Sequence, residues 1–269
     1  MEVFDIVKFL MIAAVFAPLE RLLPRRRAQR TLRRLWSVDL MHAVFTGFLI
    51  RIGGAGFVVL AAALGESTMP TAWRDHIQAL PLPVQFVLIV IIADLGFYAM
   101  HRAFHHYPLL WRIHSIHHSI EEMDWLAAHR VHPIDQILTR MMTLAPVFYL
   151  GFSSDAMIAF LFLYEWQSFL IHSNVKVNFG LLRWLLASPE FHHWHHANED
   201  EAHDKNFAGQ LPLIDALFGT AYMPKHRQPE RYGVDQEIPA SYSGQLAFPF
   251  RQHPGQQQED ALRSAQPIS

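Results

Sequence analysis

The sequence predicts an all-α fold, an integral membrane helical bundle with a cytoplasmic helical cap rich in histidine. Three features predict it: long apolar stretches in the first half, an arginine-rich segment between two of them, and histidine clusters that begin where the third stretch ends. The 269 residues are 51% hydrophobic and 17% charged, which excludes a disordered chain. With 18 His and no Cys, disulfides, zinc–thiolate sites, Cys-ligated iron–sulfur clusters and a Cys nucleophile are also excluded.

The apolar stretches have roughly the length that a membrane span requires. A bilayer core about 30 Å thick needs roughly 20 apolar residues to cross as a helix. Three stretches meet or approach this length: Val3–Leu19, Val38–Leu64 and Leu82–Met100. The first is short, and we expect an uncleaved anchor because no small-residue cleavage site follows it. The second contains three closely spaced glycines, which favour tight packing against another helix.

The segment between the first two stretches is strongly basic. It has no acidic residue between Glu20 and Asp39 and contains seven arginines: Arg21, Arg25, Arg26, Arg27, Arg30, Arg33 and Arg34. The positive-inside rule places such a segment in the cytoplasm. The chain then crosses outward and back, so His101 emerges on the cytoplasmic side. A basic surface loop or a nucleic-acid patch is the alternative, but the flanking apolar segments favour the topological interpretation, and we expect no nucleic-acid partner.

A fourth apolar region, Ile134–Ile171, is interrupted by Pro146 and by the turn-forming sequence at 151–155. Two helices of about 15 residues are too short to cross comfortably, so either a re-entrant hairpin or two tilted spans is expected. Both return His172 to the cytoplasmic side. We therefore expect three parts: residues 1–81 with the N-terminal membrane helices and basic loop, 82–225 with the histidine clusters, and 226–269 as a tail whose Gln-rich end is disordered.

Histidines occur in three local clusters with helical spacing. The sequence His101-Arg-Ala-Phe-His105 is an i, i+4 pair, and two HxxHH triplets follow it. Together they supply eight imidazoles: His101, His105, His114, His117, His118, His192, His195 and His196. One structural zinc needs only four ligands, so eight imidazoles favour two metal ions. Neutral imidazole suits zinc, copper, iron and nickel.

Further polar residues lie close to these clusters in the sequence. The single residues His132 and His172 are candidates to complete the metal shell. His129 and Asp204 are candidates for the residues around the metal ligands. For Asp204 the reason is that a carboxylate often accepts the ring N–H of a metal-bound histidine. Asn206 is a third, placed to bind a metal-bound water.

The order of these motifs resembles the fatty acid hydroxylase and sterol desaturase superfamily of integral-membrane di-iron oxygenases. The resemblance covers roughly residues 94–220, and within the superfamily the chain looks most like the alkylglycerol-monooxygenase-like branch. The matching motifs are Asp94–His105, Pro108–Ser119, Arg130–Pro133, Ile171–Asn174, Pro189–His196, Asp204–Phe207 and Asp215–Thr220. One position departs from it: the fungal and plant fatty acid 2-hydroxylases have a further histidine where this chain has Ser168. His132 is taken as the substitute.

The resemblance implies ten iron ligands, namely His101, His105, His114, His117, His118, His132, His172, His192, His195 and His196. It implies that two iron ions use dioxygen to oxidise an aliphatic C–H bond of a fatty acyl, sterol or ether lipid. Zinc can replace iron on purification, as the Irving–Williams order indicates. No dinucleotide fingerprint or haem motif is visible, so the resemblance implies electrons from a redox partner protein or a reduced pterin. The lipid, the choice among hydroxylation, desaturation and ether cleavage, and the oligomeric state stay open.

Two other functions fit part of the pattern. A histidine-rich metal transporter or sensor needs polar residues inside successive spans, whereas only His42 lies well within an apparent span here. A zinc hydrolase needs an acidic base beside an open zinc, as in H-E-x-x-H. That motif is absent from the sequence.

Overall fold

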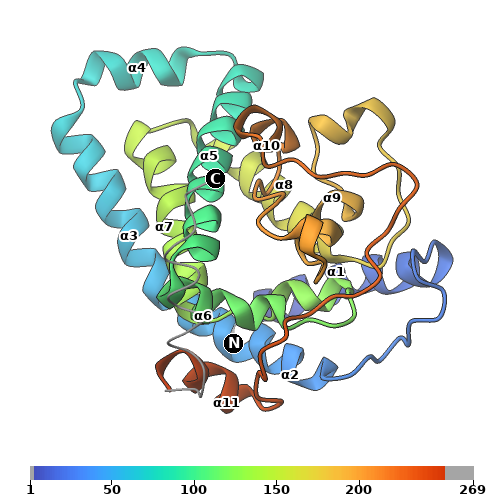
Figure 1. The fold of residues 1–269 in the computed structure, drawn as a ribbon. Coiled ribbons are helices and arrows are strands. Elements are labelled where there is room, and N and C mark those ends of the chain that lie inside the picture. Colours follow the sequence, from blue (N-terminus) through green and yellow to red (C-terminus); the bar gives the residue numbers. More distant parts are fainter. Residues whose placement is uncertain (1–2, 252–269) are drawn as a thin grey trace.

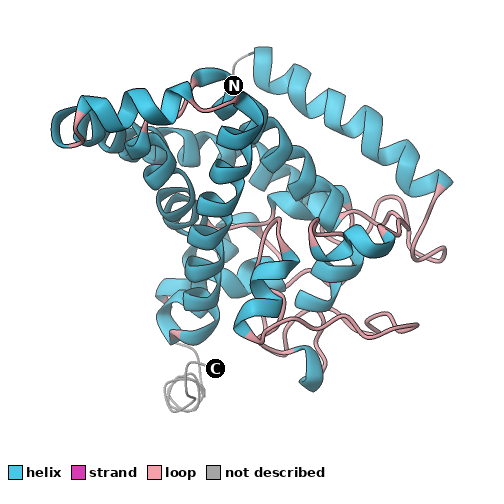
Figure 2. Ribbon diagram, turned by 90° about the horizontal axis from the view of Figure 1, so that it is seen from above, coloured by secondary structure: helices cyan, strands magenta, loops and turns pink. Residues whose placement is uncertain are grey.

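The computed structural model describes residues 3–251, and every regular element in that range is helical (Figures 1 and 2). The β-type contacts in this range are two isolated bridges, Pro24 with Val175 and Ala197 with Tyr232. The prediction of an all-α fold is therefore confirmed for these residues. Most of the Gln-rich end that was expected to be disordered lies outside the described residues.

Within the described part of the chain, two helices are long and apolar enough to cross a membrane. The first runs from Trp36 to Thr68 and comprises α2 (Trp36–Met41), the π-turn η1 (His42–Thr46) and α3 (Gly47–Thr68). The second is α5 (Leu82–His106), and both have a mean hydropathy of 2.0 in their apolar windows. Only 17% and 33% of those windows are buried. Apolar side chains that face outward on this scale indicate a membrane protein.

The short helix α4 (Thr71–Ala79) joins α3 to α5 at one end of the bundle (Figure 1). It follows Pro70, and Pro81 precedes α5, so proline separates α4 from both long helices. The two long helices are thus antiparallel. Their other ends, the start of α2 and the histidine-bearing end of α5, lie together at the opposite end of the bundle (Figure 1).

The fourth apolar region forms two helices, α7 (Pro133–Leu150) and α8 (Ser154–His172), which are joined by a short turn and each pack against α5. Its turn reaches the start of α5, where the backbone N–H of Ser153 donates to Oε1 of Gln85 at 2.9 Å. Close approach of the helices depends on glycine. A Cβ atom at Gly96 would lie 2.1 Å from the carbonyl oxygen of Met142, so α5 and α7 pack backbone to backbone there.

Helix α1 (Val3–Leu22) packs along α8. Ile12 and Phe16 are buried against Phe169, and near the end of α1 the Glu20 carboxylate accepts hydrogen bonds from the backbone N–H groups of Trp125 and Asn174. The first apolar stretch is thereby fixed to segments that flank the histidine clusters.

The remaining elements are short and form a cap over the histidine-bearing part of the bundle, with α6 and α11 at the end of α5 and α9 and α10 beside α5 (Figure 1). They are α6 (Pro108–His118), η2 (Trp125–His129), η3 (Gly180–Trp184), α9 (Pro189–His195), η4 (Asp200–Ala202), α10 (Pro212–Phe218), α11 (Tyr242–Ala247) and η5 (Phe248–Phe250). A buried ion network ties the basic segment to this cap. The Arg33 guanidinium contacts Asp39 and Asp124, and Arg130 contacts the second oxygen of Asp39.

Candidate metal centre

Nine buried imidazoles lie in two neighbouring groups, and within each group the candidate ligand atoms are all within 4.8 Å of one another. The group of five consists of His101, His105, His114, His118 and His195. The group of four consists of His117, His172, His192 and His196. The three clusters visible in the sequence therefore converge in space, together with His172 from the end of α8.

Helix geometry explains how the residues are divided. His114 and His118 on α6 are four residues apart, so they share a face and enter the same group. His117 is one residue before His118 and therefore points about a quarter-turn away, into the other group. On α9 the same rule places His192 and His196 in the group of four and turns His195 toward the group of five. Each HxxHH triplet thus serves both groups.

The Nε2 atoms converge inside each group. In the group of five, Nε2 of His114 lies 3.0 Å from that of His101 and 3.2 Å from that of His118. In the group of four, Nε2 of His192 lies 2.9 Å from that of His172 and 3.1 Å from that of His196. Two imidazole nitrogens bound at right angles to one ion, at a typical bond length, lie about 3.0 Å apart. The separations fit ligation of one metal ion by each group.

Four of the outer ring nitrogens are held by backbone carbonyls. Nδ1 of His101 donates to the Phe207 carbonyl at 2.7 Å, and Nδ1 of His195 donates to that of Lys205 at 2.8 Å. In the group of four, His117 donates to Arg130 at 3.0 Å and His172 to Ser168 at 2.6 Å. A neutral imidazole that donates through Nδ1 presents a lone pair at Nε2, so these bonds fix the tautomer that a metal ligand needs.

Burial favours the uncharged form of several of these imidazoles. Burial and, after it, the neighbouring imidazoles lower the pKa values of His117, His118, His192 and His196 well below 6.5. Burial lowers the pKa of His195 to about 3. Lone pairs aimed at each other across 3 Å repel unless a cation lies between them. The buried Nε2 atom of His195, moreover, has no hydrogen-bond partner in the described part of the chain, so the donor set fits a bound metal ion.

Two carboxylates also contact the candidate ligands. Oδ1 of Asp204 lies 3.2 Å from Nδ1 of His105, the type of contact expected from the sequence. Oδ2 of Asp135 lies 2.7 Å from Nδ1 of His114. Sequence reasoning missed Asp135, although it follows the Arg130–Pro133 motif by only two residues. Both carboxylates orient the ring to which they bind.

The other predicted site residues lie outside the two groups. Nδ1 of His132 accepts the backbone N–H of Ile134, and its Nε2 donates to the Leu246 carbonyl, so both ring nitrogens contact protein. His129 packs against Phe169. The Asn206 side chain donates hydrogen bonds to the Phe191 and Tyr222 carbonyls and accepts the backbone N–H of Tyr222.

The loop at 204–211 is the main support that the sequence did not reveal. Asp94 on α5 accepts hydrogen bonds from the backbone N–H groups of Gly209, Gln210 and Leu211 at 2.7–3.0 Å. Asp215 accepts from those of Phe207 and Ala208. These bonds hold the loop in place, and with it the Phe207 and Lys205 carbonyls that accept hydrogen bonds from His101 and His195. Backbone carbonyls leave no signature in a sequence, which is why this support could not be foreseen.

Residues 86–220 match the family model for fatty acid hydroxylases. The chain belongs to the fatty acid hydroxylase family. The matched range contains all nine converging histidines, and the resemblance inferred from their spacing is confirmed.

Named relatives in this family are enzymes that act on lipids. The chain is 26% identical over 249 residues to the ornithine lipid hydroxylase OlsE of Rhizobium tropici, covering 91% of this chain and 75% of that protein. It is 35% identical over 129 residues to the alkylglycerol monooxygenase of Homo sapiens, covering 47% of this chain and 28% of that protein. The chain spans at most a third or so of the alkylglycerol monooxygenases it matches. No solved structure matches it significantly.

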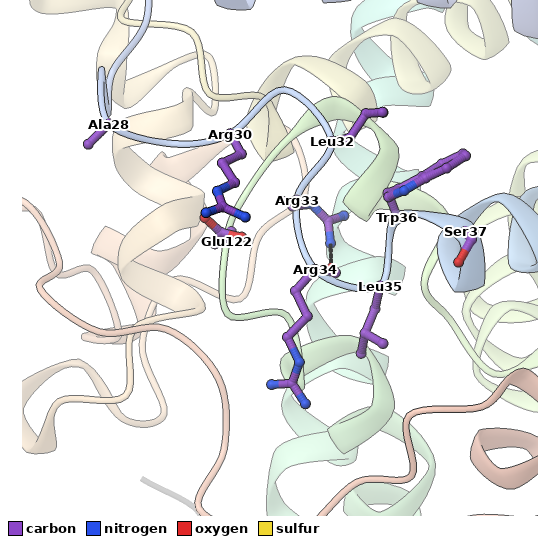
Figure 3. Close-up of a pocket in the computed structure, with 9 residues that line it drawn as sticks. All are labelled: Ala28, Arg30, Leu32, Arg33, Arg34, Leu35, Trp36, Ser37 and Glu122. Atoms are coloured by element: carbon purple, nitrogen blue, oxygen red, sulfur yellow. Dashed lines mark hydrogen bonds between the residues drawn. The ribbon is translucent and has the colours of Figure 1, made fainter.

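A surface hollow of about 690 Å³ lies apart from the metal ligands, on the basic segment (Figure 3). Arg30 and Arg34 extend along it, and Trp36 lies at its other side (Figure 3). None of the nine converging histidines lines it, so it is not part of the candidate metal centre.

Proposed function

We propose that this membrane protein is a di-iron hydroxylase that inserts one oxygen atom of dioxygen into an aliphatic C–H bond of a polar membrane lipid. The family assigns lipid C–H oxidation to the chain. The observation that carries the metal assignment is the convergence of nine buried imidazoles in a group of five and a group of four. Hydroxylation is favoured over desaturation because the relatives compared above are hydroxylases and monooxygenases by name.

The nine converging histidines are the proposed iron ligands, and His132 is left out of the set. Both of its ring nitrogens are engaged with protein, and it caps the start of α7. When bound, the two irons supply the oxidising power that an unactivated C–H bond requires and that no protein side chain provides. The protein's own residues position these irons and isolate them.

Positioning is carried out by the outer hydrogen bonds. The carbonyls of Phe207, Lys205, Arg130 and Ser168 hold their imidazoles in the Nδ1-protonated tautomer, while Asp135 and Asp204 orient two more rings. Isolation comes from aromatic packing. Phe104 is fully buried and stacks on His114 with a ring separation of 5.1 Å. A water-poor lining of this kind limits loss of the oxidant to solvent.

The topology fits a centre on the cytoplasmic face. The basic segment precedes α2, and α5 delivers His101 and His105 at the same end of the bundle (Figure 1). The positive-inside rule would place that end in the cytoplasm. The turn between α7 and α8 reaches Gln85 near the start of α5, and we propose that these two helices cross the bilayer as two spans. Electrons would then come from a cytoplasmic redox protein or reduced pterin.

Lipid profiling under isotopically labelled dioxygen tests the proposal. Cells that express the chain should gain lipids with one labelled hydroxyl oxygen, and cells that express the His117→Ala variant should not. Loss of two hydrogens without oxygen gain would instead establish desaturation. Unchanged lipids with altered cellular metal content would overturn the proposal and favour a metal transporter.

Ether cleavage is the second candidate, since two alkylglycerol monooxygenases match this chain with higher identity, 32% over 157 residues and 35% over 129 residues, although over shorter lengths than the ornithine lipid hydroxylase. Hydroxylation of the carbon beside an ether oxygen gives a hemiacetal, which separates into an alcohol and an aldehyde. The same profiling experiment detects this outcome as a fatty aldehyde formed from a supplied alkylglycerol.

A further inference from the structure

Two short elements of the cap expose an unusual amount of apolar surface. We define the cap patch as the exposed side chains of Leu181, Leu182, Leu185, Leu213, Leu217 and Phe218, on and beside η3 and α10. Leu181 is 91% exposed and Leu217 is 75% exposed. The two elements contact each other, so these side chains form one surface. Contiguous apolar surface in a polar cap marks an interaction site.

The cap patch lies on the outer side of α10 and η3, whose inner sides are anchored to the rest of the protein. On α10, Ile214 and Asp215 are buried while Leu213 and Leu217 point outward. The Asp215 carboxylate bonds the backbone of the 204–211 loop, and Gln210 of that loop accepts the backbone N–H of Ala187 just after η3. The outward leucines are therefore held in place on a rigid support.

The patch is continuous with the apolar surface of α5. The ring of Phe218 stacks on that of Tyr98, with centroids 5.1 Å apart, and Leu95, one helical turn before Tyr98, is 41% exposed on α5. The Tyr98 hydroxyl also accepts a hydrogen bond from Arg102 at 3.3 Å. On the η3 side, Arg183 lies over the ring of Trp184 at 5.5 Å. Aromatic and arginine side chains are typical of the layer where lipid headgroups meet acyl chains.

We propose that the cap patch lies in the membrane, among the acyl chains of the leaflet from which α5 emerges, and that lipid substrate is taken up there. The occupant is bilayer lipid, because the patch extends a membrane-facing helix surface and has cationic residues at its rim. The patch also lies close to the metal centre. The element η3 precedes α9, which carries His195, and α10 binds the loop whose carbonyls accept hydrogen bonds from His101 and His195. The uptake part rests on the proposed lipid hydroxylation.

The absence of cysteine from the chain allows a direct test. Single variants Leu181→Cys and Leu217→Cys are labelled with an environment-sensitive fluorophore and placed in phosphatidylcholine–phosphatidylglycerol vesicles whose acyl chains carry bromine. Val59→Cys is the control for a label within the acyl chains, because Val59 lies on the apolar helix α3 and its side chain is 67% exposed. Glu201→Cys, on exposed η4, is the aqueous control.

We expect the labels at 181 and 217 to lose fluorescence to the brominated chains as the label at 59 does, while the label at 201 keeps its fluorescence. Equal behaviour of 181, 217 and 201 would overturn the proposal. Labels that are shielded from aqueous quenchers and yet unaffected by brominated lipid would also overturn it, since they would indicate a protein partner. This readout needs no turnover, so it succeeds or fails independently of the hydroxylase assignment.

Uptake is tested separately with Leu217→Ser. The variant should raise KM for lipid substrate in vesicles severalfold, with kcat and bound metal unchanged. Ala216→Ser, a neighbouring exposed position on α10, is the matched control and should leave KM unchanged. An unchanged KM in Leu217→Ser would overturn the uptake role while leaving membrane contact and hydroxylation intact.

Discussion

The backbone carbonyl of Arg130 accepts the Nδ1 hydrogen bond of His117 at 3.0 Å, while the Arg130 guanidinium pairs with Asp39. Asp39 lies well before the residues that match the family model. A residue of the N-terminal part of the chain therefore helps to hold an imidazole of the group of four. Arg33 and Asp124 belong to the same buried network, because the Arg33 guanidinium contacts both Asp39 and Asp124.

The Asp39→Asn variant should destabilise the protein by about 3–5 kcal/mol, because it leaves the buried guanidinium of Arg130 without its countercharge and that of Arg33 with Asp124 alone. Thermal unfolding in detergent measures the loss. Asp235→Asn, which breaks the exposed Arg231–Asp235 pair, should cost less than about 1 kcal/mol. An equal effect of the two substitutions would contradict the role assigned to the network.

The two imidazole groups should lose metal independently. His195→Ala removes one ligand from the group of five, and His117→Ala removes one from the group of four. Each variant should bind fewer metal ions per chain than the wild type and should lose lipid hydroxylation. Metal analysis by mass spectrometry and lipid assays measure both properties. Full metal content with full turnover in either variant would refute the ligand assignment.

His132→Gln provides the contrasting case. Because His132 lies outside both groups and contacts the Leu246 carbonyl and the Ile134 N–H, its loss should leave the metal content unchanged. A modest loss of thermal stability is expected from the weakened helix cap, about 1 kcal/mol. Loss of one metal ion would instead restore His132 as the tenth ligand that the sequence suggested.

Removal of metal should lower the melting temperature of the wild-type protein, since converging neutral imidazoles repel without a cation and binding to the folded state stabilises it. Chelation followed by reloading with iron or zinc, monitored by differential scanning fluorimetry, measures the effect. In the His117→Ala variant the increase in melting temperature on reloading should be smaller. An identical melting temperature before and after chelation would argue against metal binding by the folded protein.

The sequence predicted the helical fold, the long apolar helices and the individual histidines that converge, because apolar length and i, i+4 spacing are local properties of the chain. It did not predict how each HxxHH triplet divides between two groups, since that depends on how α6 and α9 face each other. It also missed Asp135 and the carbonyls of Arg130 and Phe207. Those contacts arise from tertiary packing, and a backbone carbonyl has no residue type that would reveal it.

Glycine packing between α5 and α7 gives the last prediction. A Cβ atom at Gly96 would lie 2.1 Å from the Met142 carbonyl oxygen, whereas one at Gly56 would meet nothing within 4 Å. Gly96→Ala should therefore force α5 and α7 apart and cost about 1–3 kcal/mol or more. Gly56→Ala, also within an apolar helix, should be neutral or stabilising by up to about 1 kcal/mol because alanine favours helix. Thermal unfolding of the pair decides whether the close α5–α7 contact exists. Because α5 carries His101 and His105 while α7 carries Asp135, Gly96→Ala should also reduce metal binding, and Gly56→Ala should not.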